Sequence, residues 1–309
     1  ANGREAVEMA GRLKPDLITM DVAMPEMDGI AAVREIMRAH PTLIIMISAL
    51  TSEGARATLE ALDAGAVDFM AKQQGLGADK ASALHTRIID ITRSRPVSGP
   101  DAVHRVADAR IERKVASNQH ALRPGLILIG ASTGGPVAIQ RVLATLPANY
   151  PYPLLVAVHM PAEFTATFAE RLDHLCSLKV RLATDGEELR AGTALIAPGG
   201  QQTLVESHQG RKRVRIRPGG EQIYKPSVDL TFGSAARALD GDSLAVVLTG
   251  MGTDGTDGAR MLKDRGGSVW SQDEQSSVVY GMPFSVAKAG LSDRVLALDD
   301  IGEALQGLA

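Results

Sequence analysis

The sequence predicts the α/β fold class, with two doubly wound domains built on mainly parallel sheets. Short apolar runs alternate with longer amphipathic stretches, which is the pattern of repeated strand–helix units. The length of 309 residues is enough for about two domains. With 45% hydrophobic and 22% charged residues, the composition is that of an ordinary globular protein.

The first series of strand–helix units spans residues 1–92. Helices are expected between its strands, and Gly65 stands where it would end the helix that contains Leu59 and Leu62. The next stretch, residues 93–122, is rich in Pro, Gly, Ser and alternating charge and contains no apolar strand, so we expect an interdomain linker. The strands predicted in the first series are residues 16–20, 43–47 and 66–70.

The second series spans residues 123–309 and includes a segment of a different kind. Val214 and Ile216 alternate with arginines after a turn at Gly210, and this period of two predicts a β-hairpin. Its basic stripe fits either a docking face for an acidic partner or a solvated strand face. The other strands predicted in this series are residues 126–129, 154–158, 193–197, 244–248 and 268–270.

The composition excludes several classes of protein. A formal net charge of −3 and an aromatic content of 3% argue against a nucleic-acid partner. No apolar run reaches the roughly 20 residues that span a bilayer, so we expect no membrane insertion. The single Cys176 suits the reducing cytoplasm, where we expect the protein to be located.

Three polar residues with complementary chemistry follow predicted strands of the second series. Ser132 lies in GASTGG after the strand LILI, His159 follows LLVAV, and Asp254 lies in MGTDG after LAVVL. The carboxyl ends of parallel strands meet at one edge of the sheet, where ligands bind. A serine hydroxyl needs a neighbouring base to become a nucleophile, and a carboxylate behind a histidine orients the imidazole. The three residues therefore predict a serine hydrolase.

Each of these residues also has a structural interpretation. Ser132 could cap a helix or line a phosphate loop, His159 could be a buried core histidine, and Asp254 could form a turn. A nucleotide-binding reductase is a rival prediction, because GASTGG resembles a dinucleotide loop. However, the further glycine of that fingerprint is missing, and no Tyr-x-x-x-Lys pair follows.

Five motifs make the second series resemble the chemotaxis protein-glutamate methylesterase family, CheB: IGASTGGP, VHMP, IAPGG, KPSVDLTF and LTGMGTDGTDG. The resemblance implies a Rossmann-like methylesterase domain. It also implies that Ser132 is the nucleophile, His159 the general base and Asp254 its orienting carboxylate. Thr133 and Met251 match positions whose backbone is associated with the oxyanion site. No cofactor is implied for catalysis.

The activity implied by this resemblance is hydrolysis of glutamate γ-methyl esters on methyl-accepting chemotaxis receptors, with release of methanol. Some members of the family also deamidate specific glutamines. The receptors would then be the substrate partners, and an acyl-enzyme on Ser132 would be the intermediate.

The first series carries a second group of polar strand ends. Asp21, Ser48 and Lys72 end its three strands and resemble the phosphoacceptor, the switch hydroxyl and the lysine of response-regulator receiver domains, which have a flavodoxin-like sheet. The resemblance implies phosphorylation of Asp21 by the chemotaxis histidine kinase. In the family, the receiver covers the methylesterase site until it is phosphorylated.

The receiver-like part departs from the family pattern in two respects, one of which is Gln73 in place of the proline that usually follows the lysine. Receivers place an acidic pair after their first strand to help hold Mg²⁺, and we expect this chain to lack that strand and the pair. Mg²⁺ prefers a near-octahedral shell of oxygens, so Asp21 alone would not complete a metal site. An alternative prediction is therefore a signalling module with an inactive receiver and constitutive esterase activity.

Overall fold

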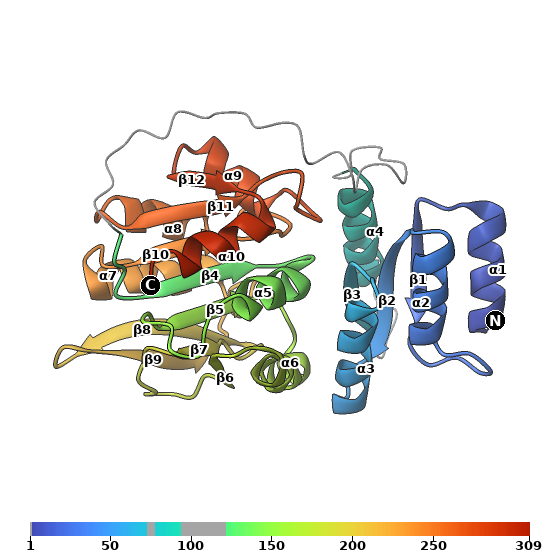
Figure 1. The fold of residues 1–309 in the computed structure, drawn as a ribbon, viewed down its shortest axis with the longest axis horizontal. Coiled ribbons are helices and arrows are strands. Elements are labelled where there is room, and N and C mark those ends of the chain that lie inside the picture. The colour runs from blue at the N-terminus through green and yellow to red at the C-terminus, as the bar shows by residue number, and fades with distance from the viewer. Residues whose placement is uncertain (1, 73–77, 94–121) are drawn as a thin grey trace.

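A computed structural model describes residues 2–72, 78–93 and 122–309. These residues form two parallel-sheet units that lie side by side, the first in blue in Figure 1 and the second in green to red. Most of the predicted linker, residues 94–121, lies outside the described residues. None of the helices formed by the described residues is both long and apolar enough to cross a membrane.

The first unit is a three-stranded parallel sheet in the order β1-β2-β3. The middle strand supplies the core, because Ile44, Ile45 and Met46 are all fully buried. Gly65 has a φ of +114° just after a helix, as its predicted role in ending that helix requires. The elements are α1 (Gly3–Leu13), β1 (Leu17–Asp21), α2 (Gly29–Ala39), β2 (Leu43–Ala49), α3 (Ser52–Asp63), β3 (Asp68–Lys72) and α4 (Ala78–Arg93).

The second unit is a seven-stranded parallel sheet in the order β12-β11-β10-β4-β5-β7-β6, with helices on both faces. The chain starts in the central strand β4 and proceeds first to one side and then to the other, which makes the ends of β4, β5 and β10 a topological switch point. The strands are β4 (Ile127–Ala131), β5 (Leu154–Val158), β6 (Lys179–Leu182), β7 (Thr193–Ile196), β10 (Leu244–Val247), β11 (Ser268–Gln272) and β12 (Arg294–Leu296). The helices are α5 (Gly135–Ala144), α6 (Ala162–Leu175), α7 (Val228–Leu239), α8 (Thr256–Lys263), α9 (Met282–Lys288) and α10 (Leu298–Gln306).

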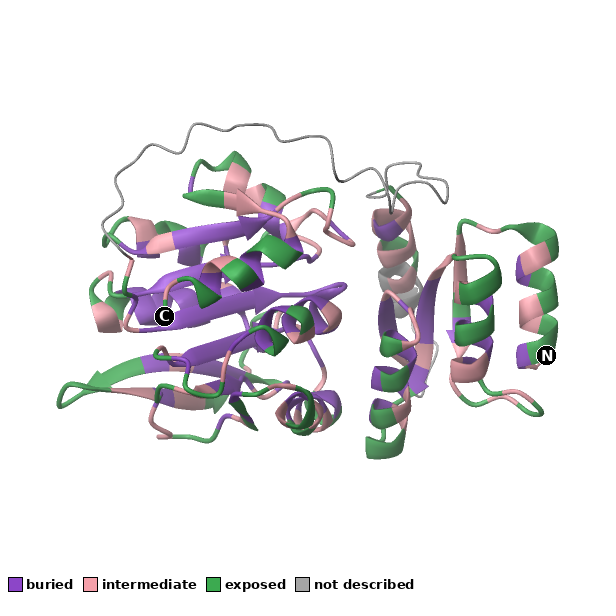
Figure 2. Ribbon diagram, in the orientation of Figure 1, coloured by how far each residue is buried: buried purple, intermediate pink, exposed green. Residues whose placement is uncertain are grey.

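The observed strands differ from the sequence prediction mainly at the edges of this sheet. The central strands β4, β5 and β10 are buried at every position, so their apolar runs are visible in the sequence (Figure 2). The edge strands β6 and β12 were missed, because both are short and partly exposed. Several predicted strand ends were also wrong by one or two residues.

The predicted hairpin is present as an antiparallel pair, β8 (Gln201–His208) and β9 (Arg211–Pro218). Its arginines already have acidic partners: Arg215 lies 3.1 Å from Asp185 and 3.2 Å from Glu206. Arg211 lies 3.9 Å from Glu188 in the same way. These contacts favour the interpretation as a solvated strand face, because the stripe carries its own counter-charges.

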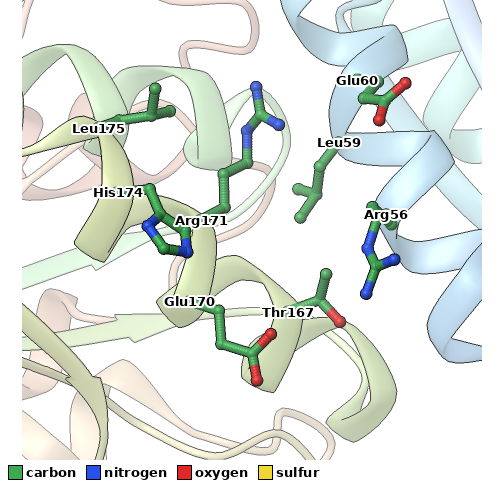
Figure 3. Close-up of a pocket in the computed structure, with 8 residues that line it drawn as sticks. All are labelled: Arg56, Leu59, Glu60, Thr167, Glu170, Arg171, His174 and Leu175. Atoms are coloured by element: carbon green, nitrogen blue, oxygen red, sulfur yellow. The ribbon is translucent and has the colours of Figure 1, made fainter.

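The two units meet along a seam between α3 and α6 on one side of the molecule. Figure 3 shows this region, with Arg56, Leu59 and Glu60 on α3 facing Arg171 and its neighbours on α6 across a cavity of about 360 Å³. Asp63 at the end of α3 forms an ion pair with Arg171.

A second part of the seam is apolar and lies nearer the carboxyl ends of β4 and β5. The rings of Phe69 and Phe164 stack across it with centroids 4.5 Å apart. Beside them, Ile45 and Ile91 of the first unit pack in one cluster with Val279 of the second. Burial of aromatic and aliphatic surface on both sides stabilises the contact between the units.

Candidate active site

The structure places Ser132 and His159 at the ends of neighbouring strands. Ser132 follows β4, and its N–H donates to Thr249 O at 3.0 Å, while the N–H of His159 donates to Ala131 O at 3.1 Å. Gly250 lies so close to the nucleophile candidate that a Cβ there would come within 2.8 Å of Ser132 Cβ. Only a residue without a side chain allows the loop after β10 to approach Ser132 in this way.

His159 and Asp254 form a direct contact. His159 Nε2 lies 2.8 Å from Asp254 Oδ2, and both side chains are at least 90% buried. An N–H on Nε2 that donates to this carboxylate fixes the tautomer, so the lone pair lies on Nδ1. Asp254 therefore orients the imidazole ring. Nδ1 is the nitrogen that remains able to accept a proton.

The Asp254 carboxylate is held by the beginning of α7. Its Oδ1 accepts hydrogen bonds from Ser227 Oγ at 3.0 Å and from the N–H of Asp229 at 2.9 Å, and its Oδ2 accepts one from the N–H of Val228 at 2.7 Å. Burial alone would raise the pKa of Asp254. The hydrogen bonds from His159 and from the backbone outweigh burial and hold this pKa below its usual value. The carboxylate is thus kept ionised.

The imidazole is covered by Tyr224. The two rings are nearly parallel, with centroids 4.2 Å apart and an interplanar angle of 6°. An aromatic face against the imidazole restricts the rotation of its ring. Next to Tyr224, Ile223 is 89% exposed at the mouth of the site.

Ser132 and His159 line the same cavity, of about 650 Å³, together with Tyr224. The first unit forms part of its wall through Asp68, Phe69, Met70 and Arg87, among others. In the complete chain Ser132 is only 7% exposed.

Asp68 lies in this wall as a buried carboxyl. Burial raises its pKa, and the charge of Arg87, whose Nε lies 3.3 Å from Asp68 Oδ2, opposes that rise. The hydroxyl of Thr133, next to the nucleophile candidate, also acts against it. Polar groups of both units therefore meet beside Ser132.

The two predicted oxyanion residues are next to Ser132 in the sequence and next to Gly250, respectively, but neither lines the Ser132 cavity. Thr133 is fully buried, and its carbonyl accepts a hydrogen bond from Thr249 Oγ1 at 3.0 Å. Met251 is partly buried and packs against the apolar cluster of the seam. Stabilisation of an oxyanion by the backbone of these residues stays a prediction.

The predicted receiver residues are brought to one edge of the three-stranded sheet. Lys72 forms an ion pair with the carboxylate of Asp21, and both side chains remain partly exposed. Ser48 is instead fully buried, and its hydroxyl donates to Gly54 O at 3.0 Å at the start of α3. The structure thus joins Asp21 to Lys72 and leaves Ser48 bonded within its own loop.

The described residues do not complete a Mg²⁺ site at Asp21. No group of three or more His, Cys, Asp or Glu side chains in this part of the chain could hold a metal ion. Asp21 has a lysine as its neighbour, which competes with a cation for the same carboxylate oxygens.

Several residues of the site were not singled out in the sequence. The motif KPSVDLTF was noted, but no role was assigned to Ser227 or Asp229, and Tyr224 just before it was missed. The hydrogen-bonding potential of Ser227 and Asp229 beside a glycine-rich loop could have drawn attention to them. Nothing in the periodicity indicates that Tyr224 stacks on a histidine 65 positions earlier.

Fold and site together define a class of protein: a parallel α/β unit with Ser, His and Asp at its switch point, beside a receiver-like unit that walls the cavity. Residues 127–305 match the family described as CheB methylesterase, and residues 1–80 match the response regulator receiver domain. The chain belongs to the CheB methylesterase family. The predicted family, enzyme class and fold class are thereby confirmed.

The relatives cover nearly the whole chain. A protein-glutamate methylesterase/protein-glutamine glutaminase of Vibrio parahaemolyticus is 51% identical over 98% of this chain and 88% of its own length. One of Pseudomonas aeruginosa is also 51% identical, over 98% of this chain and 89% of its own length. The crystal structure of the Thermotoga maritima CheB methylesterase catalytic domain covers 60% of this chain and 100% of that domain, at 39% identity and a TM-score of 0.58.

Proposed function

We propose that this protein hydrolyses glutamate γ-methyl esters on methyl-accepting chemotaxis receptors in the cytoplasm. The observation that carries the proposal is that Ser132 and His159 line one cavity, and that His159 is paired with the buried carboxylate of Asp254. The names of the relatives supply the substrate class, and they add glutamine deamidation as a second reaction of the same site. The test is methanol release from methylated receptor, measured together with labelling by a fluorophosphonate.

The site residues account for both halves of the reaction. Ser132 Oγ attacks the ester carbonyl carbon while His159 Nδ1 takes the hydroxyl proton, and the imidazolium then returns a proton to the departing methoxide. Methanol leaves and an acyl-enzyme remains. His159 next takes a proton from water, which attacks the acyl carbon and frees the glutamate carboxylate and Ser132. With a glutamine substrate, ammonia leaves in place of methanol.

The backbone of Thr133 and Met251 would stabilise the negative charge that develops on the carbonyl oxygen. Thr133 follows Ser132 directly and precedes α5, and Met251 follows Gly250, which closely approaches Ser132, in the loop after β10. Backbone N–H groups aimed at such a charge stabilise it in the transition state. This step needs no cofactor.

The receiver-like unit controls access to the site in this proposal. Its residues form part of the cavity wall and leave Ser132 nearly enclosed, which favours regulation over constitutive activity. Asp21 would accept a phosphoryl group from the chemotaxis histidine kinase. The alternative of an inactive receiver predicts that Asp21→Asn leaves activity unchanged both with and without the kinase.

Removing residues 1–92 is expected to raise kcat/KM toward methylated receptor by on the order of tenfold or more, because the wall over Ser132 is lost. Methanol release from the shortened and complete chains measures the effect. The Thermotoga maritima relative supports an independently folded catalytic domain.

A point variant tests the same contact between the units without removing any residues. Phe69→Ala removes the ring that stacks on Phe164 and leaves the catalytic unit intact, so it should raise kcat/KM in the same direction. If neither change alters kcat/KM, the receiver-like unit does not restrict access.

A further inference from the structure

Asp229 connects the beginnings of two helices beside the catalytic strands. It lies in the first turn of α7, and its Oδ1 accepts hydrogen bonds from the N–H of Gly255 at 2.9 Å and of Gly258 at 2.8 Å. Both donors belong to the start of α8. The carboxylate therefore ties α7 to the loop that carries Asp254.

The same residue also supports Asp254 in the opposite direction. The N–H of Asp229 donates to Asp254 Oδ1 at 2.9 Å, so one residue accepts from the loop through its side chain and donates to it through its backbone. The loop is held tightly here, because a Cβ on Gly258 would lie 2.8 Å from Asp229 O. A displacement of Asp229 would therefore move Asp254 as well.

The two carboxyl groups also interact through their charges. Burial raises the pKa of Asp229 to about 6, and the charge of Asp254 acts in the same direction, while the N–H groups of Gly258 and Gly255 oppose it. The titratable groups around the pair are Asp254 and, beyond it, His159 with Tyr224 stacked on its ring. Near neutral pH the ionised Asp229 adds negative potential behind the imidazole.

We propose that Asp229 is a positioning residue for catalysis: it fixes the Asp254 loop to α7 and supports the imidazolium form of His159. The inference rests on the proposed function, since it assigns His159 the role of base. It predicts that the geometry and the charge of Asp229 contribute separately, and two substitutions separate them.

Asp229→Asn keeps an oxygen that can accept from Gly255 and Gly258 but removes the charge. We expect kcat to fall by about tenfold with little change in KM, because the loss falls on the step in which His159 becomes charged.

Asp229→Ala removes both hydrogen bonds as well and should lower kcat by about 100-fold. Asp257→Asn is the matched control, because it removes an exposed charge from the same first turn of α8. It should leave kcat, KM and the pH profile unchanged. A thermal melt of each variant separates loss of fold from loss of positioning.

The rate of fluorophosphonate labelling of Ser132, measured in each variant at one pH, gives a result that does not depend on the receptor substrate. Slower labelling in Asp229→Asn, but not in Asp257→Asn, supports the inference even if the wild-type protein releases no methanol. Absence of methanol release from the wild-type protein would count against the proposed substrate only. If Asp229→Asn changes neither the labelling rate nor kcat, the positioning role is wrong.

The free energy of unfolding should depend on pH through the same residue. Because the pKa of Asp229 is raised from 3.8 to about 6 on folding, the folded protein binds this proton more tightly than the unfolded chain. The contribution of Asp229 to the free energy of unfolding therefore declines as the pH rises from about 4 to 6. Asp229→Asn should remove this part of the pH dependence of the free energy of unfolding.

Discussion

Ser132→Ala is expected to reduce methanol release from methylated receptor by about 10⁴- to 10⁶-fold, with little change in stability. The substitution removes one oxygen from a nearly enclosed side chain, and the cavity around it keeps its shape. Without the hydroxyl no acyl-enzyme forms, and fluorophosphonate labelling should disappear in parallel. Single-turnover methanol release with a large excess of enzyme measures the remaining rate.

A matched control for this variant is Ser285→Ala. Ser285 lies on α9 and bonds to Thr256 Oγ1 at 2.9 Å, outside the cavity that contains His159. It should retain activity and labelling. Full methanol release from Ser132→Ala would instead assign the nucleophile to another residue and remove the basis for the mechanism.

Asp254→Asn is expected to lower turnover by roughly 10⁴-fold, as the corresponding change does in the Ser-His-Asp triad of serine proteases. In this protein a second effect accompanies it. Each oxygen of Asp254 accepts two hydrogen bonds, so the amide nitrogen of an asparagine faces donors in either orientation. The unsatisfied groups should reduce the free energy of unfolding by about 1–3 kcal/mol.

Urea unfolding and kinetics on the same preparation test both parts of this prediction. The rate must be measured at a urea concentration and temperature where the variant is folded. Activity within tenfold of wild type in a folded Asp254→Asn protein would show that the carboxylate does not orient His159.

Much of the fold and the main site residues could be predicted from the sequence for a physical reason. A central parallel strand is buried on both faces, so β4, β5 and β10 are continuous apolar runs with sharp ends. The residues after such runs meet at one edge of the sheet. Ser132, His159 and Asp254 all follow such runs, so the sequence alone predicts that they lie close together.

The remaining parts of the site depend on contacts between segments that are far apart in the sequence. Tyr224 lies in an irregular segment with no period, and its stacking on His159 follows only from the folded chain. The two hydrogen bonds to Asp229 come from residues 26 and 29 positions later in the sequence. The edge strands β6 and β12 were missed because exposed strands carry a weak apolar signal.

Residues of both units form the wall of the Ser132 cavity. This arrangement determines which kinetic constant would change on phosphorylation of the receiver-like unit. If, as proposed, a receptor helix engages Ser132 only in molecules whose two units have separated, the apparent affinity falls by the fraction of such molecules. If about one molecule in a hundred were open, the apparent dissociation constant would rise about 100-fold, while the turnover of bound substrate stayed the same. Regulation would then change the apparent affinity for the receptor and leave kcat unchanged. Its effect on the rate would be largest at low receptor concentration.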